Sequence, residues 1–64
     1  MKLNGTEIRL EKPQSLKSFL QDNKMPMEKS AVEVNGDIIP RSEFETHMVY
    51  DEDTIEVVSF VGGG

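Results

Sequence analysis

Two Asn-Gly dipeptides, Asn4-Gly5 and Asn35-Gly36, constrain the fold of this chain most strongly. Asn-Gly is the pair most favoured in two-residue β-hairpin turns, because both positions accept a positive φ. Each pair lies within a stretch that has apolar residues at alternate positions, residues 1–10 and 31–39. The sequence therefore predicts two hairpins. The residues expected to face the core are Leu3, Ile8, Leu10, Val32 and Val34.

One amphipathic helix is expected between the two hairpins. Ser15 is a candidate N-cap, and Leu16, Phe19 and Leu20 follow it at the spacing of one helical face. Pro26 excludes a longer helix, so we expect the helix to end near residue 23 or 24.

The segment after the second hairpin has weaker signals. Pro40 removes an N–H donor, so the strand predicted at Ile38-Ile39 is brief or lies at a sheet edge. Residues 41–47 are expected to form an irregular or one-turn helical segment, with Ser42 as a candidate cap and Phe44 as its apolar anchor. Residues 51–53, Asp-Glu-Asp, predict a turn before the last strand.

The carboxyl-terminal segment is a strand of β-branched and aromatic residues, 54–61, followed by Gly62, Gly63 and Gly64. If Ile55 and Val57 face the core, then Val58 and Phe60 lie with Glu56 on the other face. Exposed apolar residues beside such a tail often mark a docking site, so we predict that Val58 and Phe60 contact partner proteins. The alternative is that they pack under residues 41–47.

The order of these elements predicts an α+β fold. One helix covers one face of a mixed sheet of four to five strands. A last strand placed beside the first, in the middle of the sheet, gives the ubiquitin-like β-grasp. We expect a β-grasp domain over residues 1–61 and a flexible glycine tail over residues 62–64.

Composition excludes several classes of function. The 64 residues allow one small domain, and the absence of Cys excludes disulfides and thiolate metal sites. The net charge of −5 argues against nucleic-acid binding, which requires Lys and Arg to neutralise phosphates. No stretch resembles a signal peptide or a membrane helix, so we expect a cytoplasmic protein, monomeric when alone.

Other polar and sulfur-containing residues favour structural roles. The acidic residues Glu43, Glu45 and 51–53 lack the spacing of a calcium loop, which favours a solvated surface. The lone His47 has no partner ligands at metal-binding spacing. Met25, Met27 and Met48 are expected to fill gaps in the core.

With these elements placed, the chain resembles the ThiS family, the sulfur carriers of thiamine thiazole biosynthesis, over its whole length. The terminal glycines are the most specific part of the match. The matching residues are Val34-Asn35-Gly36, Ile39-Pro40-Arg41, Phe44, Asp51, Asp53, Ile55 and Phe60-Val61-Gly62-Gly63-Gly64.

This resemblance implies a protein carrier, not an enzyme, that binds no cofactor itself. A ThiF-like adenylyltransferase would use ATP to activate the Gly64 carboxylate, with Gly62 and Gly63 threading into its active site. A cysteine desulfurase or a persulfide donor would supply sulfur, and thiazole synthase would receive it from the Gly64 thiocarboxylate. Family members commonly end at two glycines, so Gly63 is the alternative reactive residue. The chain has no phosphate-binding loop or nucleophile–base pair, which agrees with a substrate that other proteins act upon.

Three other functions share this sequence pattern. The small subunit of molybdopterin synthase carries sulfur in the same way, although such chains are typically longer. A ubiquitin-like modifier of lysines would use the same activation. A β-grasp binding module with a passive tail would retain activity without Gly63 and Gly64, whereas the carriers would lose it.

Overall fold

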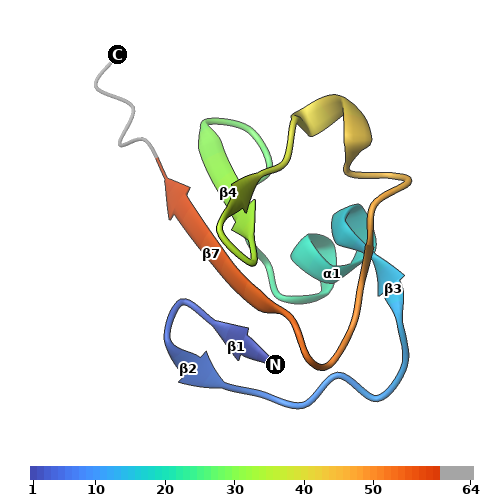
Figure 1. Cartoon of the computed structure of the whole chain (residues 1–64). Coiled ribbons are helices and arrows are strands. Elements are labelled where there is room, and N and C mark those ends of the chain that lie inside the picture. Colours follow the sequence, from blue (N-terminus) through green and yellow to red (C-terminus); the bar gives the residue numbers. More distant parts are fainter. Residues whose placement is uncertain (60–64) are drawn as a thin grey trace.

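The computed structural model describes residues 1–59 of the chain (Figure 1). Short strands flank a single α-helix and a single 3₁₀ turn in this part of the protein. The elements are β1 Lys2–Leu3, β2 Thr6–Glu7, β3 Gln14–Ser15, α1 Leu16–Asp22, β4 Ser30–Val34, β5 Asp37–Ile38, η1 Arg41–Glu43, β6 Met48–Val49 and β7 Thr54–Ser59.

The main sheet has the order β2-β1-β7-β4-β5, so the last strand lies at its centre. β7 runs parallel to β1 and antiparallel to β4. Figure 1 shows α1 beside one face of this sheet. The predicted α+β architecture and the central position of the last strand are confirmed, and the topology is that of the β-grasp.

Both predicted hairpin turns are present. The φ angles are 51° at Asn4, 83° at Gly5, 53° at Asn35 and 88° at Gly36. β5 lies at Asp37–Ile38, one residue earlier than predicted, and it is an edge strand as expected. The Ile39 amide still donates to the Val32 carbonyl (2.9 Å), and the ladder ends there because Pro40 follows.

The helix begins and ends as predicted. The Ser15 hydroxyl accepts a hydrogen bond from the Ser18 amide (3.1 Å), and the C-cap is Asn23. Two further amides of the first turn, which have no partner within a helix, donate across the molecule. Leu16 N–H donates to the His47 carbonyl (2.7 Å) and Lys17 N–H to the Phe44 carbonyl (2.8 Å). Residues 44–47 therefore hold the start of α1.

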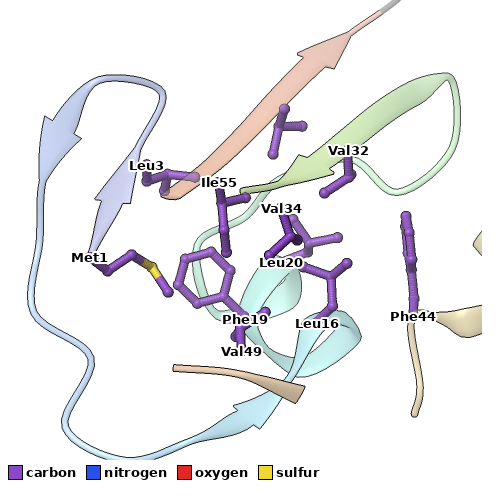
Figure 2. Close-up of a cluster of buried hydrophobic side chains, with 11 residues drawn as sticks. Met1, Leu3, Leu16, Phe19, Leu20, Val32, Val34, Phe44, Val49 and Ile55 are labelled. Atoms are coloured by element: carbon purple, nitrogen blue, oxygen red, sulfur yellow. The ribbon is translucent and has the colours of Figure 1, made fainter. Parts of the chain in front are cut away.

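The core lies between α1 and the sheet (Figure 2). Leu16, Phe19 and Leu20 of α1 are buried, as the helical pattern predicted, and they share the core with apolar residues of the strands. The complete set is Met1, Leu3, Leu16, Phe19, Leu20, Val32, Val34, Phe44, Val49, Ile55 and Val57.

Three local features differ from the sequence expectations. Pro40 is the N-cap of η1 and no side chain caps the turn, so the predicted cap Ser42 is wrong; Ser42 lies inside the turn. Met48 is 42% exposed and fills no gap, because it alternates with the buried Val49 along β6. The pairing of β3 with β6 in a separate two-stranded sheet was not predicted. Phe44 is the buried anchor of its segment, as expected, at 3% exposure.

Candidate functional site

The carboxyl-terminal half of β7 is the part of the described structure that leads into the predicted reactive tail. β4 pairs with β7 as far as Ser59, where Ser30 lies opposite. On the other side of β7, within the described residues, β1 pairs with Thr54 and Ile55 only. The Asn4 side-chain oxygen then accepts a hydrogen bond from the Val57 amide (2.7 Å), where the β1 backbone has turned away. Within residues 1–59, the strand beyond Val57 therefore has a paired neighbour on one side alone.

The two faces of β7 differ as predicted. Ile55 is fully buried and Val57 is 9% exposed, whereas Val58 is 58% exposed and Glu56 is exposed. This exposure excludes the alternative in which Val58 packs under residues 41–47. Its predicted contact with partners stays a prediction.

Most of the predicted site lies outside the described residues. Phe60, Gly62, Gly63 and Gly64 belong to residues 60–64, as does the predicted domain boundary after residue 61. The structure thus places one predicted docking residue, Val58, on the solvent-facing side of the central strand.

The start of β7 is held by a network of polar side chains from the second hairpin turn and from residues 50–54. The Asn35 amide nitrogen donates to Asp53 (2.9 Å), and the Thr54 N–H donates to the Asn35 side-chain oxygen (2.9 Å). Asp53 also accepts from the Tyr50 amide (2.8 Å), which closes the turn before the strand. These hydrogen bonds fix the position of Thr54, and so they help to place the next residue, Ile55, in the core.

Asp51 ties the amino-terminal hairpin to the same turn. Its carboxylate accepts from the Leu10 amide (2.8 Å) and from the Met1 amino group (3.3 Å), which also donates to the Ile8 carbonyl (3.1 Å). The hydrogen bond from Leu10, followed by that from the terminal amine, lowers the pKa of Asp51. Asp51 is exposed, as expected of an acidic surface, and the carboxylates of Asp51 and Asp53 also hold the fold through hydrogen bonds to Leu10 and Asn35 that were not predicted.

The remaining polar residues that the structure describes form no metal site. Among residues 1–59, no group of three His, Asp or Glu side chains lies close enough to hold a metal ion. An open hollow of about 310 Å³ lies beside Lys17, Arg41 and Phe44, and Lys17 there pairs with Glu45 at 3.0 Å. The helical segments of residues 1–59 lack the length and apolar character that a membrane span requires.

The fold defines a class: a β-grasp domain in which the last described strand, β7, lies at the centre of the sheet. The family model described as "ThiS family" matches residues 1–64, and the chain belongs to this family of small sulfur carriers of thiamine biosynthesis.

Two relatives and one solved structure are similar to this chain over nearly all of its length. The chain is 34% identical to the uncharacterized protein ycf40 of Pyropia yezoensis and 30% identical to that of Porphyra purpurea, covering all of this chain and 90% of each relative. The crystal structure of the thiamine biosynthesis protein ThiS from Geobacter metallireducens has a TM-score of 0.85 at 29% identity, covering 98% of this chain and 96% of that one.

One further relative is much longer. A thiazole synthase of Paramagnetospirillum magneticum is 34% identical over 62 residues, which are 97% of this chain but 19% of the relative. That protein therefore contains a segment similar to this whole domain.

Proposed function

We propose that this protein carries sulfur to thiazole formation as a thiocarboxylate on its terminal glycine, Gly64. The observation that carries the proposal is the family match over all 64 residues, including the three glycines. The domain supports it by holding β7 at the centre of the sheet, because strand pairing on both sides of Thr54 and Ile55 resists displacement of the strand.

The chemistry of a carboxyl terminus requires activation. An α-carboxyl group has a pKa of about 3.3–3.7, so at neutral pH it is an anion that resists nucleophiles. Adenylation by a ThiF-like enzyme would join the Gly64 carboxylate to AMP and release pyrophosphate from ATP. A persulfide formed on a cysteine desulfurase or on a carrier would then displace AMP and give an acyl disulfide. A thiol would reduce the S–S bond of this intermediate and leave the thiocarboxylate on Gly64. ATP is thus consumed by the partner, and this chain needs no bound cofactor.

Glycine suits the terminal positions for a steric reason. Without Cβ atoms, Gly62 and Gly63 could pass through a narrow channel with the backbone close to the partner's walls. The absence of Cys protects the product, because a thiol could attack the acyl-adenylate or the thiocarboxylate.

Thiazole synthase is the proposed acceptor of the sulfur. The thiazole synthase of Paramagnetospirillum magneticum contains a segment similar to this chain, which favours physical association of the two functions. In this scheme the chain binds its partner enzymes one after another in the cytoplasm and is a monomer when it is unbound.

An intact mass spectrum after incubation with the adenylating enzyme, ATP and a sulfur source tests the proposal. We expect a mass gain that corresponds to one oxygen replaced by sulfur, and fragmentation should localise it to Gly64. If sulfur appears only on a chain that has lost one glycine residue, the reactive carboxylate belongs to Gly63, because the carboxyl group of Gly63 lies in a peptide bond while Gly64 is present. An unchanged mass with active enzyme would contradict the carrier function and favour a passive binding module.

The matched control is a chain that lacks Gly63 and Gly64. Thermal unfolding should be the same as for the full chain, because glycines without side chains add nothing to an apolar core. Sulfur loading should be lost completely. Retained loading in this shortened chain would show that the tail is not the site.

A further inference from the structure

The sheet face that points away from α1 carries a small surface of mixed character. Side chains alternate along strands, and residues directly opposite one another share a face. Glu33 lies opposite both Glu56 and Ile38, and Ala31 lies opposite Val58. We call these residues the outer patch. Its members are Ala31, Glu33, Ile38, Glu56 and Val58.

Two carboxylates face each other in the outer patch. Glu33 on β4 and Glu56 on β7 are directly paired in the antiparallel ladder. Like charges opposite one another destabilise a sheet. Within the described part of the chain, neither carboxylate forms an ion pair; the pairs present involve the Met1 amine and Lys17. The facing pair of Glu33 and Glu56 therefore does not stabilise the isolated domain.

The same patch contains the two large apolar side chains with the highest exposed fractions in the described chain. Ile38 is 69% exposed and Val58 is 58% exposed. Ile38 lies in the row of the two glutamates, and Val58 lies two residues after Glu56 on the same strand. A partner that covers these apolar side chains would also remove water from the carboxylates, which strengthens their need for a cation.

We propose that the outer patch binds thiazole synthase through an arginine that lies between Glu33 and Glu56, with apolar residues of the partner covering Ile38 and Val58. This inference rests on the proposed function. An arginine fits because its planar guanidinium can donate to two carboxylates at once. The net charge of −5 favours approach to a basic surface.

The position of the patch suits delivery of the tail. Val58 precedes Gly64 by six residues. Six residues span at most about 20 Å when extended. Docking through the outer patch would therefore keep the terminal carboxylate within about 20 Å of the contact.

The test is the affinity for the thiazole synthase of the same organism, measured by calorimetry at several salt concentrations. The variants are Glu33→Gln, Glu56→Gln and the double variant. Glu11→Gln is the control, because it removes one charge from an exposed loop between β2 and β3. The double variant should bind about tenfold more weakly or worse, with a smaller salt dependence. The control should change the dissociation constant less than about twofold.

Thermal unfolding of the same variants provides a second readout. Removing the facing charges should raise the midpoint by roughly 1–5 °C while binding weakens. A double variant that binds like Glu11→Gln overturns the inference. So does a double variant that loses both stability and affinity, since the glutamates would then be structural, or a wild-type chain that thiazole synthase does not bind.

These outcomes are separate from the test of the proposed function. If the wild-type chain acquires sulfur but the glutamate variants bind thiazole synthase normally, the carrier function stands and the outer patch is not the contact. If the chain acquires no sulfur under active conditions, the carrier function itself fails.

Discussion

The two ends of β7 are held in opposite ways. At its start, Thr54 and Ile55 lie between β1 and β4, and Asn35 and Asp53 add side-chain hydrogen bonds. At its other end, Ser59 pairs with β4 alone among residues 1–59, and Val58 faces solvent. Polar contacts thus fix the register where the strand enters the core, whereas apolar surface is left exposed where the chain approaches its terminus.

The charges of the amino-terminal hairpin also differ from those of the β4–β7 pair. Lys2 lies opposite Glu7 in the amino-terminal hairpin, so unlike charges face each other there. Glu33 lies opposite Glu56 in the second half, where like charges face each other. The charges of the first pair favour the isolated fold, whereas those of the second pair disfavour it. If the proposed contact is correct, the sheet separates residues that stabilise the fold from residues that bind a partner.

The largest expected effect comes from the buried start of β7. Ile55→Ala removes a fully buried side chain. Such a change costs about 2–5 kcal/mol in the free energy of unfolding, because it loses apolar burial and leaves a cavity. Chemical denaturation should measure this loss. Val58→Ala, on the exposed face of the same strand, is the control and should cost far less. Equal losses in the two variants would break the comparison.

The next effect concerns the link between Asp51 and the amino-terminal hairpin. The folded state lowers the pKa of Asp51, so the stability that its carboxylate contributes is complete above the ordinary pKa of about 4. This contribution is lost as the pH falls through the lowered value. Asp51→Asn should therefore be less stable than wild type at pH 7, and the difference should shrink in acid.

Thermal unfolding between neutral and acidic pH measures this difference. Glu52→Gln, at the exposed neighbouring position, is the control and should show little effect at any pH. A difference between Asp51→Asn and wild type that stays constant down to the most acidic conditions would contradict the role of the carboxylate.

The smallest effect on stability is expected at Val58. Val58→Thr keeps a β-branched side chain on an exposed strand position, so the free energy of unfolding should change by no more than about 0.5 kcal/mol. If the side chain docks on a partner, burying the new hydroxyl without a hydrogen bond costs about 1 kcal/mol or more, roughly fivefold in affinity. Unchanged affinity for both the adenylating enzyme and thiazole synthase would exclude Val58 from docking.

Local patterns predicted much of the fold. The two Asn-Gly turns, the Ser15 cap and the buried face of α1 depend on residues within a few positions of each other. The predicted exposure of Val58 followed from strand alternation once Ile55 was assigned to the core. The pairing of β3 with β6 was missed, because two-residue strands contain too few positions for a periodicity to be recognised.

The hairpins, the helix and the alternation of β7 could be predicted from the sequence, because turn chemistry and side-chain period act over short distances. The family could be predicted because its motifs are spread along the whole chain. Which distant groups meet became known from the folded structure. It brought Asp51 to the Leu10 amide and Glu33 opposite Glu56, contacts that no local spacing encodes. Such contacts depend on strand order and register, which are set when the whole core closes and not by any one segment.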